Sequence, residues 1–210
     1  MEEREKAEIA KQFIETLLEV PVSICPRELS AMAATITQYI PEFLKNQVPF
    51  FITETMARSF EPMVLYHITD FIRFNFNLFL YRNGNQEELL IAGPYLLHQP
   101  DQQFCEEVLQ DNGLTVSLVM PFLEYCQALP VVGNSTMLLA SRTAMKVITG
   151  SEEAPYRHYQ PQAIHQNEVS NISTYGMEEA TMELLEQRYR FEKLMLQEVA
   201  QGNPETALSY

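Results

Sequence analysis

Histidine and aspartate are the side chains of this sequence that could take part in acid–base chemistry or bind a metal. His67 lies three residues before Asp70 in an apolar stretch, and His158 and His165 lie seven residues apart in a polar one. A catalytic pair or a metal centre needs further groups nearby, and the chain contains no HExxH pair, Walker loop, GxGxxG turn or GxSxG elbow. We therefore predict no catalytic residue, no metal, no cofactor, and a protein that is not an enzyme.

The cysteines are the other candidates for metal or redox chemistry. Cys25, Cys105 and Cys126 are widely separated, and no CxxC motif or Cys/His cluster is present. This spacing argues against a zinc site and against a disulfide framework. We expect all three to be small buried apolar residues.

Aromatic residues in the middle of the chain give the clearest indication of a binding site. Between residues 72 and 81, side chains alternate with a period of two, which is typical of a β-strand with one apolar face. Sensor domains bind small molecules in apolar pockets between such a sheet and its covering helices. The predicted effector-binding residues are Tyr66, Phe74, Phe76, Phe79 and Tyr95.

Other interpretations of the same strand remain open. The aromatic residues, together with Tyr81, could simply form the core of the domain. The opposite face carries Arg73, Asn75 and Asn77, which could meet a polar ligand or could be a solvent-exposed strand face.

Turn and cap signals around the aromatic run predict an antiparallel meander sheet covered by helices. Asn83-Gly84 favours a hairpin between strands at 72–81 and 88–97, and Gly93-Pro94 indicates a bulge or an edge in the second of them. A further strand is expected at 63–68. Helices are expected at 2–19, 27–46, 101–113, 115–129 and 134–149.

The expected fold class is therefore α+β, divided into four parts along the chain. In order they are an N-terminal helical hairpin, a sensor-like α+β domain, a linker or edge strand, and a connector helix, at 1–46, 47–150, 151–175 and 176–210. In the second part, 47–62 is expected to be irregular or a short helix. In the third part, an edge strand could form from Tyr156, Tyr159 and Ile164.

The tail from Thr174 to Ala207 contains the longest uninterrupted helical pattern of the chain. One face of this predicted helix is apolar and needs a partner, either the body of the domain or the same helix of a second copy. Gly202-Asn203-Pro204 ends the helix. The residues predicted to connect or dimerise are Met182, Leu185, Tyr189, Leu196 and Val199.

The charge of the chain excludes some partners. A formal net charge of −14 argues against binding of these 210 residues to nucleic acid, because that affinity comes mainly from lysine and arginine on phosphates. It also argues against binding to an anionic membrane surface. No apolar run is long enough to span a bilayer, and no signal peptide precedes the charged start. We expect a cytoplasmic protein.

Four stretches together resemble the regulatory region of AraC-type transcription regulators from Gram-positive bacteria. They are ITDFIRFNFNLFLYR at 68–82, IAGPYLL at 91–97, PFLEYCQALPVV at 121–132 and EQRYRFEKLMLQEVAQGNPETAL at 186–208. In the tail, the matching residues are Arg188-Tyr189, Glu192, Leu194, Val199 and Gly202-Asn203.

The resemblance implies a PAS-like or GAF-like sensor that binds a small-molecule effector, forms a homodimer and relays its state along the tail helix. Regulators of this kind end in a pair of helix-turn-helix motifs, which these 210 residues do not contain. Contact with DNA is therefore expected only through a C-terminal domain outside this sequence. The alternative is a dimerisation or scaffold module that binds no ligand.

Overall fold

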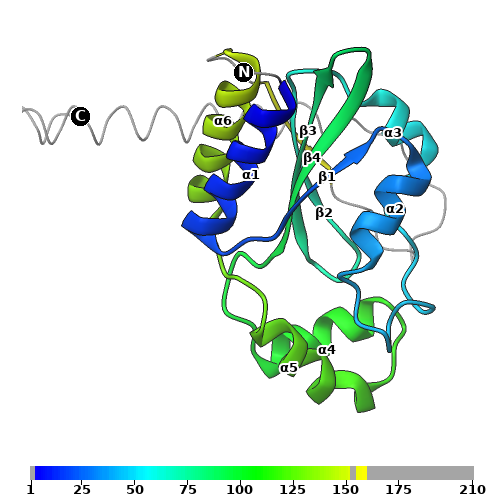
Figure 1. Ribbon diagram of the computed structural model, residues 1–210. Coiled ribbons are helices and arrows are strands. Elements are labelled where there is room, and N and C mark those ends of the chain that lie inside the picture. Colours follow the sequence, from blue (N-terminus) through cyan, green and yellow to red (C-terminus); the bar gives the residue numbers. More distant parts are fainter. Residues whose placement is uncertain (1–2, 152–154, 160–210) are drawn as a thin grey trace, which may run out of the picture. The chain divides into compact units, whose positions relative to one another are not determined.

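The computed structural model describes residues 3–151 and 155–159, which form a five-stranded sheet with helices on both faces (Figure 1). The strands lie in the order β1-β4-β3-β2-β5. Their bounds are Val22–Pro26 for β1, Leu65–Thr69 for β2, Asn75–Asn83 for β3, Gln86–Tyr95 for β4 and Tyr156–Tyr159 for β5. This architecture confirms the predicted α+β class.

The helices are close to those expected from periodicity, with two differences. The helix expected at 27–46 ends before Pro41, and the one expected at 115–129 begins with a 3-10 turn. The bounds are Glu3–Leu18 for α1, Leu29–Thr37 for α2, Glu54–Ser59 for α3, Gln102–Asp111 for α4, Val116–Leu118 for the turn η1, Val119–Gln127 for α5 and Asn134–Thr149 for α6. Within the described ranges, no helix is long and apolar enough to cross a membrane.

The predicted meander forms the centre of the sheet. Strands β2, β3 and β4 pair antiparallel in sequence order, and Asn83 pairs with Gln86 across a two-residue turn. Gly84 in this turn has a φ of 60°, a conformation that glycine adopts without steric cost. The Asn-Gly signal therefore identified the hairpin correctly.

The two outer strands extend the sheet beyond that meander. At one edge, β1 pairs antiparallel with β4, and at the other edge β5 pairs parallel with β2. The sheet is therefore mixed and not purely antiparallel. Tyr156 and Tyr159 lie in β5, which confirms the edge strand, whereas Ile164 and the predicted tail helix at 176–210 lie outside the described residues.

Each face of the sheet has its own apolar core. Helices α1 and α6 cover one face and α2 and α3 lie over the other, while α4 and α5 lie beyond one end of the sheet and pack into the same core as α2 and α3 (Figure 1). Strand β1 separates α1 from α2, so these two helices pack on opposite faces. The expected N-terminal hairpin of two helices packed together is therefore wrong, and 1–46 contributes a strand and two layers to the same sandwich as 47–150.

A bulge in β4 depends on a glycine. Asn75 pairs with Tyr95 and Asn77 with Ala92, so two residues of β4 lie opposite one residue of β3. One of these two is Gly93, with a φ of 143°. A Cβ atom on this residue would lie 2.6 Å from the carbonyl oxygen of Asn75 and 2.7 Å from a ring carbon of Phe76. Only glycine fits at this close approach of two strands.

We expect Gly93→Ala to destabilise the fold by roughly 2–4 kcal/mol, because the clash is with backbone and the φ value is unfavourable for alanine. Gly133→Ala is the matched control, since nothing lies within 4 Å of its added methyl group. Chemical denaturation of the two variants measures the difference. Equal stabilities would show that the bulge tolerates a side chain.

Candidate functional site

The structure divides the predicted effector-binding residues between the two faces of the sheet. Tyr66, Phe74 and Phe76 lie in the core beneath α2–α5, whereas Phe79 and Tyr95 lie in the core beneath α1 and α6. All five side chains are buried. One pocket cannot be lined by both sets, so the prediction of a single five-residue site is wrong in its grouping.

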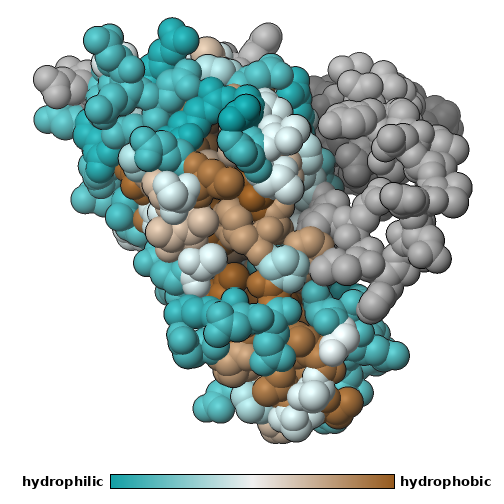
Figure 2. All heavy atoms as spheres, turned by 90° about the vertical axis from the view of Figure 1, so that its right-hand side faces the viewer, coloured by the Kyte–Doolittle hydropathy of each residue, from teal (hydrophilic) through white to brown (hydrophobic). Residues whose placement is uncertain are grey.

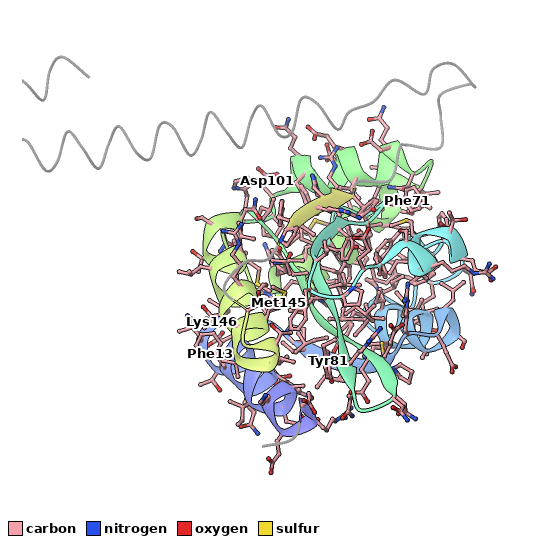
Figure 3. All side chains as sticks on the ribbon, turned by 90° about the horizontal axis from the view of Figure 1, so that it is seen from above. Phe13, Phe71, Tyr81, Asp101, Met145 and Lys146 are labelled. Carbon is pink, nitrogen blue, oxygen red and sulfur yellow. The ribbon has the colours of Figure 1, made fainter. Side chains whose placement is uncertain are left out.

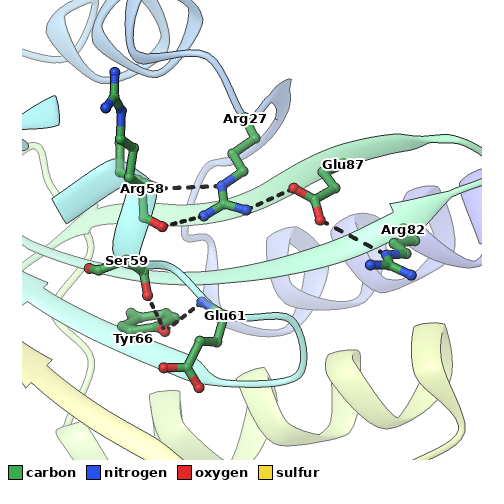
Figure 4. A network of polar contacts seen from close by, with 8 residues as sticks. Arg27, Arg58, Ser59, Glu61, Tyr66, Arg82 and Glu87 are labelled. Atoms are coloured by element: carbon green, nitrogen blue, oxygen red, sulfur yellow. Dashed lines mark hydrogen bonds and ion pairs between the residues drawn. The ribbon is translucent and has the colours of Figure 1, made fainter. Parts of the chain in front are cut away.

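The hydroxyl of Tyr66 is engaged by the protein itself. It accepts a hydrogen bond from the backbone N–H of Glu61 at 2.8 Å and donates to the carbonyl oxygen of Ser59 at 3.4 Å (Figure 4). Burial raises the pKa of this phenol. Tyr66 therefore holds the segment after α3 against β2.

Asn75 and Asn77 do not form a solvent-exposed strand face. Both are buried, at 3 % and 1 % exposure, on the face that α1 and α6 cover. Arg73 lies outside β3, in a turn with a φ of 62°, and its guanidinium binds Glu107 at 3.2 Å and Asp111 at 2.8 Å in α4. The predicted alternation of residue types is confirmed, but the polar face of β3, expected to meet a polar ligand or solvent, packs into a second core.

These asparagines belong to a buried polar cluster that we regard as the candidate site. His67 Nδ1 lies 2.8 Å from Asn77 Oδ1, and the Tyr95 hydroxyl donates to the same oxygen at 3.0 Å. Asn77 Nδ2 donates to Ser141 Oγ of α6 at 2.9 Å. Three neighbouring strands and the covering helix therefore meet at one amide group.

Strand β5 is part of the same cluster. His158 pairs with His67 across the parallel ladder, and the two ring centres are 4.9 Å apart. Thr69 Oγ1 lies 3.5 Å from His158 Nε2 and donates to Asn75 Oδ1 at 2.9 Å. The cluster thus connects the centre of the sheet to its last described strand.

Burial disfavours charge on two members of the cluster, His67 and Tyr95. The pKa of His67 is lowered to about 4, mainly by burial and also by the neighbouring His158, while hydrogen bonds to Asn77 and Asn75 oppose the shift. Burial raises the pKa of Tyr95 above its usual range. In the described part of the chain, every buried side-chain nitrogen or oxygen has a hydrogen-bond partner. The arrangement is suited to holding elements together and not to activating a nucleophile.

Asp70 is the second buried ionisable group near this site. Its Oδ1 accepts hydrogen bonds from the backbone N–H groups of Ile72 at 3.0 Å and Phe74 at 2.7 Å, which shapes the turn into β3. Burial raises its pKa to about 8, although the two N–H donors oppose that shift. Burial therefore favours the protonated form of Asp70.

The cysteines and histidines do not form a metal-binding cluster among the described residues. Cys25, Cys105 and Cys126 are buried free thiols, as expected, and burial raises the pKa of each. Among the described residues, no group of three or more His, Cys, Asp or Glu side chains could hold a metal ion. His165 lies outside those residues.

A surface recess of about 690 Å³ lies beside the β3–β4 turn, and charged side chains line it. Arg27 is one of the lining residues. Its guanidinium donates hydrogen bonds to the carbonyl oxygens of Ala57 and Arg58, and to the carboxylate of Glu87 at 2.8 Å (Figure 4). Glu87 also pairs with Arg82 at 3.9 Å. Arg27, directly after β1, thus connects this end of β1 to α3 and to β4. This structural role accounts for the charged lining of the recess without a ligand.

Comparisons of the chain with protein-family models, with curated proteins and with solved structures find no match. The fold and the site define a class, an α/β/α sandwich around a mixed five-stranded sheet with a buried polar cluster.

The low pKa of His67 predicts acid sensitivity. In the unfolded chain, His67 binds a proton below its ordinary pKa of 6.5, whereas in the folded chain it does so only near pH 4. As pH falls from 6.5 to 4, this difference lowers the stability of the folded state by up to about 3 kcal/mol. We expect the stability difference between the protein and His67→Gln to shrink from pH 7 to pH 4. Exposed His98→Gln is the control and should leave the profile unchanged.

The raised pKa of Asp70 predicts the opposite dependence of folding stability on pH. Its folded pKa is raised from 3.8 to about 8, so the folded state keeps a proton that the unfolded state releases, and stability falls as pH rises through this window. Asp70→Asn retains Oδ1 but cannot ionise. Urea unfolding should find that the stability of this variant relative to the parent rises from pH 5 to pH 8.5. Asp101→Asn, which retains a good helix cap, should show no such pH dependence.

Proposed function

We propose that this chain is the regulatory sensor region of an AraC-type transcription regulator, with a PAS-like or GAF-like sheet architecture. A small apolar or aromatic effector binds between the sheet and α2–α5. The predicted tail helix relays the bound state to a helix-turn-helix domain attached beyond it, as in the regulators that the sequence resembles. The domain itself catalyses no reaction and contacts no DNA.

The observation that carries this proposal is the unequal covering of the two sheet faces. Two regular helices of 16 residues each, α1 and α6, cover one face. The core on the other face is enclosed by helices of 9, 6, 10 and 9 residues joined by irregular segments. Short elements open locally at low cost in free energy, and ligand-binding segments come from such regions.

The cover on that side also has the chemistry for an apolar ligand. Tyr66, Phe74 and Phe76 form its floor, and Phe50, Phe43 and Met56 pack partly buried above them. Figure 2, which faces the α2 and α3 side, shows apolar side chains gathered in the middle of this face and framed by hydrophilic ones. An aromatic effector would stack on these rings.

The buried polar cluster supplies a relay. A ligand that displaces β2 or β3 changes the position of His67 and Asn77, and hence the hydrogen bonds to Ser141 of α6 and the contact with His158 of β5. The relay works only if the ligand binds the displaced arrangement of β2 and β3 with a different affinity from the described one. Strand β5 immediately precedes the segment that contains the predicted connector helix.

A thermal-shift screen of small aromatic and apolar compounds on the 210-residue chain tests the proposal. A ligand at 100 times its Kd stabilises the folded state by about 2.7 kcal/mol. For a chain of this size, we expect the melting temperature to rise by roughly 5–10 °C.

Two matched variants locate the binding face. Met56→Trp fills space on the α2–α5 side and should weaken binding of a hit compound at least tenfold, whereas Leu138→Trp on the α1/α6 side should bind it normally; both parent residues are partly buried. If neither variant alters binding, the hit compound binds elsewhere and the proposed face is wrong. If no compound raises the melting temperature, the alternative of a scaffold module without a ligand is favoured.

A further inference from the structure

Exposed apolar residues are concentrated on one surface of the described fold. Of the eight large hydrophobic side chains exposed there, five lie on α1 and α6, with exposures between 38 % and 68 %. They are Ile9, Phe13, Leu17, Leu139 and Val147. We call this set the α1/α6 row.

The row is ordered along both helices. Ile9, Phe13 and Leu17 are spaced by four residues, and Leu139 and Val147 by eight, so each group lies along one side of its helix. The helices pack against each other and run in opposite directions (Figure 1). In Figure 3, Phe13 of α1 and Lys146 of α6 lie beside each other at the outer surface. The two groups therefore share one surface.

This side of α1 is the one that the sheet does not use. Arg4 binds both carboxylate oxygens of Glu88 in β4, at 2.9 and 3.0 Å. Phe13 follows Arg4 by nine residues, which is two and a half helical turns, and so lies on the opposite flank. The core-facing residues Ala7, Ala10 and Ile14 lie between the two flanks. The row is thus additional to what α1 needs for packing.

The charge of this surface differs from that of the rest of the chain. Helices α1 and α6 together carry four acidic and five basic residues, a net charge of +1, whereas the whole chain carries −14. Association of two copies through any strongly acidic surface would be opposed by repulsion between like charges. The α1/α6 layer is a surface on which a second copy can approach without that cost.

The size of the layer also fits a second copy. A helix of 16 residues is about 24 Å long, and two adjacent helices are roughly 20 Å wide. The flat footprint is therefore roughly 500 Å². Side chains add to the accessible surface above this flat value, which lies just below the lower end of stable interfaces at roughly 600 Å² per partner. A two-fold axis uses the same patch on both subunits, so one row suffices for both halves of the interface.

We propose that the α1/α6 row is the homodimer interface of this protein, with the row of one copy packed on the row of a second copy. This interface is independent of the predicted apolar face of the tail helix. It does not require an effector, so its failure would leave the proposed sensor function standing, and the reverse also holds.

Sedimentation velocity of the 210-residue chain over the micromolar range tests the interface. We expect a dimer whose Kd rises roughly tenfold or more in Phe13→Glu and again in Leu139→Glu, since each places a charge in an apolar contact. Met120→Glu is the matched control: Met120 is 64 % exposed on α5, away from the row, and its substitution should leave the Kd unchanged.

Circular dichroism separates loss of the interface from loss of the fold, because all three parent residues are exposed and the variants should retain the parent's spectrum. A dimer that persists unchanged in both row variants would overturn the proposal and favour the tail helix as the contact. A parent chain that is monomeric throughout would also overturn it, and would indicate that the row binds another segment of its own chain or a different protein.

Discussion

One buried amide sets the arrangement of this fold. Asn77 lies in the central strand, at 1 % exposure, and a buried amide without partners costs several kcal/mol. Its oxygen is satisfied by His67 of β2 and Tyr95 of β4, and its nitrogen by Ser141 of α6. The register of three strands and the rotation of one helix must all meet this requirement. The apolar cores supply most of the driving force, but this amide selects which packing is adopted.

The central part of the fold could be predicted because local signals there agree with one another. Period-two alternation, the Asn-Gly turn and the Gly93-Pro94 interruption each correspond to an observed strand, hairpin or bulge. Strand β1 gave no such signal. It is five residues long, flanked by Pro21 and ending at Pro26, too short for a visible period and bounded by residues that suggest a link between helices. Without β1, the pattern of 1–46 predicts a hairpin of two helices, which the structure contradicts.

The candidate site was harder to predict, for a physical reason. Polar residues on one side of a strand usually face water, and Asn75 and Asn77 follow that pattern in sequence. Phe79 and Tyr81 continue the same side of β3, and two aromatic residues in line with the asparagines were the available sign of a second core. The contacts with Ser141 and His158 join residues more than 60 positions apart, which no local pattern reports. The same alternation could have separated Phe79 from Phe74 and Phe76.

The pairing of the first helix with the last has a consequence for synthesis. The apolar face of α1, formed by Ala7, Ala10 and Ile14, packs against α6, which begins roughly 130 residues later. At about 5–20 residues per second, a ribosome needs roughly 7–26 s to supply that partner. During this time the amphipathic helix α1 of the nascent chain has no α6 to cover its apolar face. Such a topology favours slow folding governed by non-local contacts, with apolar surface exposed in the meantime.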